Sequence, residues 1–170
     1  MEGGTINSNV TAGDGGGVFD DNGILNIGGN AVISDNTALN GGGLYLVGGE
    51  AQMKGSTVIN DNKANGGNGG GVFIDNSIFE MSGGSIEGNE CLVITGGRDG
   101  CGGGVYNWWG TFIMSRGSIT KNRIPAYGHG AGLCATPGST NEVDESRITG
   151  NLMDDDIAPD NEQFHIIALG

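Results

Sequence analysis

Two aspartates of this chain have the residue type and spacing from which acid–base chemistry can be built. Asp35 and Asp61 directly precede Asn36 and Asn62, at equivalent positions of two successive sequence repeats. If the repeats stack, the two carboxylates stand one strand spacing apart, ~4.8 Å. Enzymes that hydrolyse glycosidic bonds use a pair of carboxylates at a defined separation, with the pKa of one raised. This pair is therefore the catalytic candidate to be tested first.

The aligned positions of the other repeats argue against catalysis at this pair. They are occupied by Gly88, Lys121 and Gly150, so no third acid, arginine or histidine stands at the matching position. The two histidines, His129 and His165, have no nucleophile beside them in the sequence. We therefore predict no enzyme activity and no catalytic residue, and we interpret the aspartate pair as a solvated or ion-bridged turn.

Carboxylates also gather near the end of the chain, at Asp154, Asp155 and Asp156. Ca²⁺ takes an oxygen-rich shell that clustered carboxylates can supply. A water-exposed acidic loop has the same composition, and we favour that interpretation. Ca²⁺ stays the alternative at this cluster and at Asp35 and Asp61, and no other metal or cofactor is expected.

Two cysteines bracket the longest insertion between repeats, residues 90–101. In an oxidising compartment Cys91 and Cys101 could close this loop as a disulfide, whereas elsewhere they would remain thiols. The third cysteine, Cys134, has no partner in the repeat pattern. We expect it to be a buried or half-buried structural thiol.

Three large aromatic residues, Tyr106, Trp108 and Trp109, follow one another closely in the same repeat. At the positions of the two tryptophans the other repeats mostly carry aspartate, asparagine or glycine. Exposed indoles beside a projecting loop are typical of a surface that contacts a partner, either by stacking on sugar rings or by anchoring a protein interface. The alternative is that the indoles pack under the 90–101 insertion.

A sequence repeat must position all these residues. Six copies of the tetrapeptide Ile-x-x-Asn recur at the repeat spacing, with steps of 26 to 33 residues between their asparagines. Nearly every one of these copies is followed by glycines, an aliphatic residue and an aromatic residue. Self-similarity at this period is typical of solenoids. The asparagines tolerate a left-handed turn, and each amide can donate to one neighbouring coil and accept from the other. The expected ladder consists of Asn9, Asn36, Asn62, Asn89, Asn122 and Asn151.

The aligned repeats also contain apolar residues two positions apart, as at Phe79/Met81 and Phe112/Met114. This is the period of a strand with one buried face. We predict an all-β fold, a right-handed parallel β-helix of about six coils with three short strands each. The aromatic column that follows the glycines should point outward and form a stack.

The two ends of the chain differ. Residues 1–9 match residues 81–89 position by position, so the chain begins in mid-coil. We expect it either to continue in a longer chain or to stack end to end with another coil. We assign residues 1–151 to the coils and residues 152–170 to a cap of the same domain.

The motifs Ile33-Ser-Asp-Asn36 and Gly41-Gly-Gly-Leu44 resemble those of right-handed parallel β-helix repeats in bacterial surface proteins, within the pectin-lyase-like superfamily. They are similar to motifs of bacterial adhesin-like proteins and of chlamydial polymorphic outer-membrane proteins. Ile in place of the Phe of the chlamydial motif favours the adhesin-like group. The resemblance implies an exported, extracellular or cell-surface segment.

From this resemblance we expect a non-catalytic rigid scaffold or adhesion surface, whose partner is a host or cell-surface protein or glycan. The alternative is a β-helix that binds carbohydrate or cleaves polysaccharide. The matched motifs build the coil and touch no substrate, so the fold is better specified than the function.

Composition excludes several other classes. Twenty acidic residues against seven basic ones give a net charge of −13, which argues against nucleic acid and anionic lipid as partners. No apolar run approaches the ~20 residues that span a bilayer, and no secretion signal opens this chain, so no membrane insertion is expected. The 37 glycines occur without a Gly-x-y period, which excludes collagen and assigns them to turns.

Overall fold

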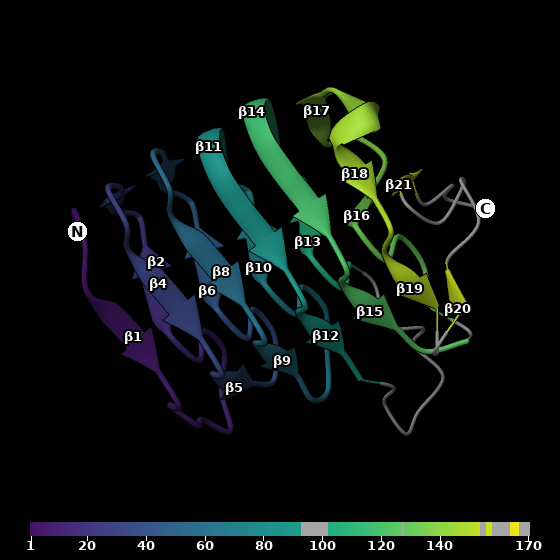
Figure 1. Ribbon diagram of the computed structural model, residues 1–170, viewed down its shortest axis with the longest axis horizontal. Helices are drawn as coiled ribbons and strands as arrows, with labels where there is room; N and C mark the ends of the chain where they lie inside the picture. The colour runs from purple at the N-terminus through teal and green to yellow at the C-terminus, as the bar shows by residue number, and fades with distance from the viewer. Residues whose placement is uncertain (93–101, 127, 154–155, 158–163, 167–170) are drawn as a thin grey trace.

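The computed structural model describes residues 1–92, 102–126, 128–153, 156–157 and 164–166. The chain forms a parallel β-solenoid of about five turns, in which three parallel sheets run along the axis (Figure 1). This confirms the predicted all-β solenoid. The turns number fewer than the six copies of the repeat because β1 (Thr5–Asn7) comes before a complete coil has formed.

The first sheet, here called the aromatic sheet, carries the residues that follow the glycine runs. Its strands pair in parallel and in register, so that Val18, Leu44, Val72, Val105 and Leu133 form one column. The strands are β2 (Val18–Asp21), β6 (Leu44–Val47), β10 (Val72–Asp75), β13 (Val105–Trp108), β16 (Leu133–Ala135) and β21 (Phe164–Ile166).

The second sheet, here called the isoleucine sheet, holds the Ile of every Ile-x-x-Asn motif in one column. It runs through β1, β4 (Val32–Ser34), β8 (Val58–Asn60), β11 (Ile78–Glu87), β14 (Thr111–Thr120) and β17 (Thr140–Val143). Three further strands pair onto it, β3 (Ile24–Ile27), β7 (Glu50–Met53) and β18 (Ile148–Thr149).

The second and third of the three expected short strands are separate in the first two coils, but not in the third and fourth. There the second and third strands fuse into the ten-residue strands β11 and β14. The connection from Met81 to Ile86 is one residue shorter than the one from Met53 to Ile59, which leaves no room for a separate turn. The pairing of β11 with β14 is in register on either side of Ser82 and shifts at Ser82 itself.

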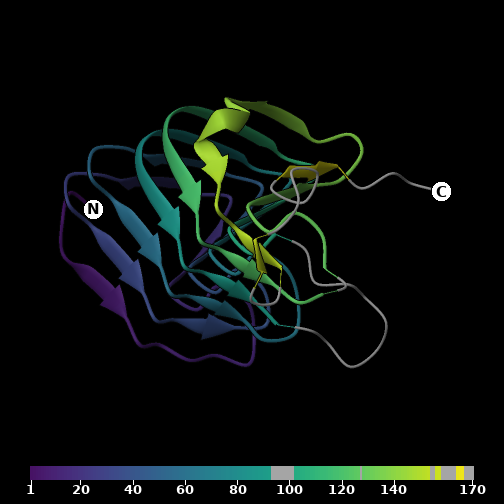
Figure 2. The same cartoon turned by 45° about the vertical axis from the view of Figure 1, so that its right-hand side comes forward.

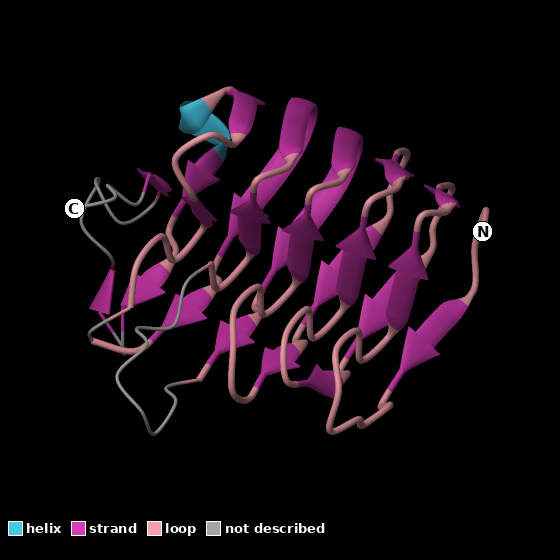
Figure 3. Ribbon diagram, turned by 180° about the vertical axis from the view of Figure 1, so that it is seen from behind, coloured by secondary structure: helices cyan, strands magenta, loops and turns pink. Residues whose placement is uncertain are grey.

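The third sheet, here called the short-strand sheet, is made of two-residue strands. They are β5 (Thr37–Ala38), β9 (Lys63–Ala64), β12 (Glu90–Cys91), β15 (Arg123–Ile124), β19 (Leu152–Met153) and β20 (Asp156–Ile157). β20 reverses direction and pairs antiparallel with β19. A short 3-10 helix, Glu145–Arg147, joins β17 to β18, and strands make up most of the rest of the described chain (Figure 3).

The core is a stack of apolar side chains inside the tube. The predicted columns of Ile, of Val and Leu, and of Phe and Met all lie in one buried cluster. Phe79 and Phe112 stack with ring centroids 5.4 Å apart. Parallel coils therefore place chemically similar side chains directly above one another, as Figure 2 shows for the strands that carry them.

The predicted asparagine ladder is present along the whole stack. Asn62, for example, donates through Nδ2 to Asn89 Oδ1 and to the Ile33 carbonyl, both at 2.9 Å. Its own Oδ1 accepts from the backbone N–H and the side-chain Nδ2 of Asn36, at 3.0 and 2.9 Å. From Asn36 to Asn151 the ladder residues are fully buried. Each buried amide is thus satisfied by its neighbours in the stack.

The glycine runs allow backbone to pack on backbone between coils. A Cβ added at Gly71 would stand 2.7 Å from the carbonyl oxygen of Gly104, and one at Gly43 would stand 2.6 Å from that of Gly71. These contacts are closer than a side chain permits. The glycines therefore bring the turns of successive coils into contact, as the sequence predicted.

Candidate functional site

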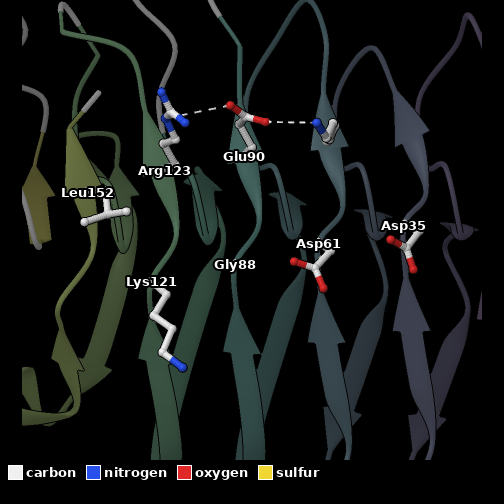
Figure 4. Close-up of a pocket in the computed structure, with 8 residues that line it drawn as sticks. Asp35, Asp61, Gly88, Glu90, Lys121, Arg123 and Leu152 are labelled. Carbon is white, nitrogen blue, oxygen red and sulfur yellow. Dashed lines mark ion pairs between the residues drawn. The ribbon is translucent and has the colours of Figure 1, made fainter. Parts of the chain in front are cut away.

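A groove of about 370 Å³ crosses the turns between the isoleucine sheet and the short-strand sheet. It is lined by two rows of residues, one from the turns and one from the short strands (Figure 4). The lining residues are Asp35, Asp61, Lys63, Gly88, Glu90, Lys121, Arg123 and Leu152. The predicted aspartate pair therefore lies in a groove together with charges of both signs.

The turn row is a column of residues in the left-handed backbone conformation. Their φ angles lie between 54° and 65°, and the residues are Ser8, Asp35, Asp61, Gly88, Lys121 and Gly150. Each stands immediately before a ladder asparagine. The prediction that the asparagine itself takes the left-handed turn is therefore wrong, because the asparagine side chain is used inside the stack and the preceding residue makes the turn. Asp and Gly tolerate this conformation, so the turn itself explains why aspartate occupies positions 35 and 61.

The two aspartates occupy successive coils, as expected. Ser34 pairs with Asn60 in the register of β4 and β8, so the next residues, Asp35 and Asp61, follow on the same turn. The Asp61 carboxylate extends over Gly88, where a Cβ would lie 2.8 Å from Asp61 Oδ1. Within the described residues, no group of three or more His, Cys, Asp or Glu side chains is placed to hold a metal ion.

The strand row of the groove is an alternating chain of charges. Lys63 Nζ lies 3.2 Å from Glu90 Oε2, and Arg123 Nε lies 3.8 Å from Glu90 Oε1 (Figure 4). Glu90 is thus held between two cations on neighbouring strands. Sequence reasoning missed this row, although its signal is in the repeat: these residues directly follow the ladder asparagines and alternate in sign, as cross-strand ion pairs do.

The remaining acidic candidates fall largely outside the described part of the chain. Asp154 and Asp155 lie outside the described residues, and Asp156 lies in β20, where the structure describes the backbone alone. The Ca²⁺ alternative at this cluster stays a prediction.

The predicted disulfide also stays a prediction. Cys91 is buried, and its Sγ donates to the Gly67 carbonyl at 2.8 Å, whereas Cys101 lies outside the described residues. Cys134 is buried beside Phe73 and Tyr106. This confirms that Cys134 is buried, and its structural role stays a prediction.

The aromatic column faces outward from the aromatic sheet, as predicted, and forms a cluster separate from the core. Phe19, Tyr45 and Phe73 stack with centroid distances of 5.5 and 4.6 Å, and Phe73 meets Tyr106 edge-on at 4.9 Å. Phe73 lies between the rings of Tyr45 and Tyr106, and Tyr106 lies between Phe73 and Cys134; Phe73 and Tyr106 are only 7% and 2% exposed. Phe19, the first ring of the column, is 52% exposed.

Trp108 and Trp109 lie at the end of β13, and Trp108 is next to the Tyr106 ring of this column. Trp108 is 41% exposed and lies 6.0 Å from Tyr106 between ring centroids. Trp109 is 53% exposed, and its ring lies over Gly138. Both indoles are therefore partly exposed to solvent, as the sequence predicted.

Trp109 also has an unusual backbone. Its φ is 57°, and the equivalent residues of the earlier coils are Asn22, Gly48 and Asn76, all left-handed as well. Asparagine and glycine suit this conformation, whereas a bulky residue there is an outlier that costs about 1–2 kcal/mol. Strain of this kind is retained where surrounding structure or function requires the side chain.

Carboxylates border the same face. The Tyr45 hydroxyl donates to Asp75 Oδ2 at 3.2 Å. Burial raises the pKa of Tyr45, and the negative charges of Asp75 and Asp14 raise it further. The face is therefore electronegative as well as aromatic.

Comparison of the chain with protein-family models, with curated proteins and with solved structures finds no significant match. Among the described residues, no helix has the length and apolar character needed to cross a membrane.

Proposed function

We propose that this chain is a non-catalytic segment of a bacterial secreted or cell-surface protein, acting as a rigid scaffold that presents an adhesive surface. We also propose that the solenoid is a right-handed β-helix of the pectin-lyase-like superfamily, of the adhesin-like type. Its partner would be a protein or a glycan on a host or other cell.

The observation that carries this proposal is Trp109. A strained, half-exposed indole stands where three other coils have residues that suit the turn, and Trp108 is exposed beside it. Both tryptophans stand at the end of β13, which pairs in register with β10 and β16 in a six-stranded sheet. Large aromatic groups on a rigid support bind with little loss of side-chain entropy, and such residues dominate interface energies.

The groove supports the non-catalytic part of the proposal. Glu90 is engaged by Lys63 and Arg123, and Asp35 and Asp61 occupy positions that the turn geometry favours for aspartate. A hydrolase would need one carboxyl held protonated opposite a second, ionised one. The ion pairs of Glu90 and the turn positions of Asp35 and Asp61 explain why these residues are acidic, and no catalytic role is needed to explain them.

The proposal is tested by probing glycan and cell-surface protein arrays with the wild-type chain and with Trp108→Ala. We expect binding by the wild type and a loss of at least about tenfold in the variant. Asp61→Asn, in the groove, is the matched control and should bind like the wild type. Absence of wild-type binding on both arrays, or equal binding by Trp108→Ala, would overturn the proposal.

The second candidate is a β-helix that binds or cleaves polysaccharide, favoured by the groove beside Asp35 and Asp61. Release of reducing ends or unsaturated products from acidic polysaccharides, measured with and without Ca²⁺, tests cleavage. Product formation that Asp35→Asn and Asp61→Asn abolish would establish this candidate and remove the non-catalytic proposal.

A further inference from the structure

The charges of the chain are distributed unevenly around the tube. The segments that form the first five strands of the aromatic sheet and their flanking turns are 13–23, 39–49, 66–77, 102–111 and 129–139. They contain Asp14, Asp21 and Asp75, together with Asp20, which stands in the inward row of Leu46 and Ile74, and they contain no lysine or arginine. The groove on the other side contains Lys63, Lys121 and Arg123. The aromatic sheet therefore presents a face of one sign, whereas the groove carries both.

Two carboxylates of this face share one row of the strand register with an indole. Asp21, Val47, Asp75 and Trp108 are aligned partners on β2, β6, β10 and β13. Neighbouring strands are ~4.8 Å apart, so Asp75 adjoins Trp108, and Asp21 stands two strand spacings from Asp75. We call Asp21, Asp75, Trp108 and Trp109 the aromatic–acidic face.

An indole beside a carboxylate suits a guanidinium group. Arginine stacks on aromatic faces within about 6 Å of the ring centroid and donates to carboxylates through a planar fork. At Trp108 and Asp75 both contacts are available to one side chain. Lysine can make the charge contact but lacks the planar fork, so arginine is the better fit.

The spacing of the face also fits an extended chain. The two strand spacings between Asp21 and Asp75 amount to ~10 Å, which an extended polypeptide covers in about three residues. An extended chain that crosses the strands could thus place two basic side chains at the two carboxylates. The overall charge of −13 would speed the approach of such a partner.

We propose that the aromatic–acidic face binds a basic polypeptide segment, with one arginine on Trp108 and Asp75 and a second basic residue near Asp21. This inference rests on the proposed function, because it names the chemistry of the partner that the exposed indoles contact. Trp108 and Trp109 are the two tryptophans of the chain, so indole fluorescence reports on this face directly.

The test is a fluorescence titration with an Arg-Ser-Gly repeat peptide, and with the same peptide in which citrulline replaces arginine. We expect the arginine peptide to change the indole emission, to bind more weakly at high ionic strength, and to bind at least about tenfold more tightly than the citrulline peptide.

Charge variants locate the binding. Asp21→Asn/Asp75→Asn should weaken binding of the arginine peptide by about tenfold or more, while Asp35→Asn/Asp61→Asn, with the same change in net charge, should leave it unchanged. Asparagine at position 75 can still accept from Tyr45, and circular dichroism checks the fold. Asp21→Asn alone, at an exposed position, provides a second variant that should weaken binding in the same direction.

Three results would overturn this inference: no binding of the arginine peptide, equal binding of the citrulline peptide, or equal loss in the groove variant. If Trp108-dependent binding to a glycan or a neutral protein is nevertheless found on the arrays, the scaffold proposal stands without this inference. If nothing binds in a Trp108-dependent manner, both fail.

Discussion

Two columns of left-handed residues run along this solenoid, and they differ in what they tolerate. The column before the asparagine ladder holds Ser, Asp, Asp, Gly, Lys and Gly, and the column after the strands of the aromatic sheet holds Asn, Gly, Asn and Trp. Apart from one lysine, the first column contains small residues that suit such turns. The second column places its largest residue, Trp109, in the same strained geometry.

The difference shows how a repeat protein separates structure from function. Each column repeats the same backbone conformation. The residue types found there in the other coils therefore indicate which side chains that conformation favours. Asp35 and Asp61 meet the requirement, and this explains them without chemistry. Trp109 violates it while remaining exposed, and the surface role proposed above rests on this difference.

The largest effect that we predict is at the ladder beside the first column. Asn62→Ala removes four hydrogen bonds, leaves the buried backbone N–H of Asn36 without its acceptor, and leaves Asn36 Nδ2 with the Ile6 carbonyl alone. We expect the free energy of unfolding to fall by about 3 kcal/mol, measured by urea denaturation.

The neighbouring residue provides the control. Asp61→Gly changes a left-handed position that other coils fill with glycine, so its free energy of unfolding should shift by less than about 1 kcal/mol. A loss at Asp61 as large as that at Asn62 would break the distinction between the ladder and the column that precedes it.

A smaller effect of opposite sign is expected at the second column. Trp109→Asn installs the residue of two equivalent coils and relieves the left-handed strain, at the cost of the ring contact with Gly138. We expect the melting temperature to stay the same or to rise by about 2–4 °C, while binding to the partner is lost.

Calorimetry and the array assay measure the two parts of this prediction separately. A drop in melting temperature of several degrees would mean that Trp109 is held for packing. The two columns would then both be structural, and the comparison would lose its functional meaning.

The smallest effect concerns the pKa of Tyr45, whose hydroxyl donates to Asp75 of the aromatic–acidic face. Since the pKa of Tyr45 is raised in the folded chain, its phenol contributes stability that is fully present below the ordinary tyrosine pKa of ~10 and is lost as the pH rises through the folded value. We expect Tyr45→Phe to flatten the fall in stability above about pH 10. Thermal melts of both proteins across alkaline pH measure this, and parallel pH profiles would show that neither burial nor the charges of Asp75 and Asp14 raise the pKa of Tyr45.

The sequence predicted the architecture well because the columns are periodic. The positions of the isoleucines, the inward Met column and the ladder asparagines follow from one alignment of the repeats, and the pairing register agrees with it. The outward direction of Phe19, Tyr45 and Phe73 follows from the alternation of side chains along a strand.

Features that depend on a single residue or on contact between columns were not predictable in this way. The fusion of strands in β11 and β14 results from a connection shorter by one residue, which an alignment treats as a gap. The groove arises where the turn column meets the row of Lys63, Glu90 and Arg123, and no one repeat contains that contact. The left-handed residue was misplaced by one position, because asparagine suits both the turn and the ladder.

The ladder has a direction, and this limits how coils can be joined. Along the ladder, the Oδ1 of each asparagine from Asn36 on accepts from the asparagine of the coil before it, and the Nδ2 of each one up to Asn122 donates to the asparagine of the coil after it. The side-chain amide dipoles therefore point the same way along the axis. Aligned amides polarise one another, much as peptide dipoles do in a helix. A further coil can therefore extend the row only in the same orientation. A reversed coil would place acceptor against acceptor or donor against donor, and the stack would repel it.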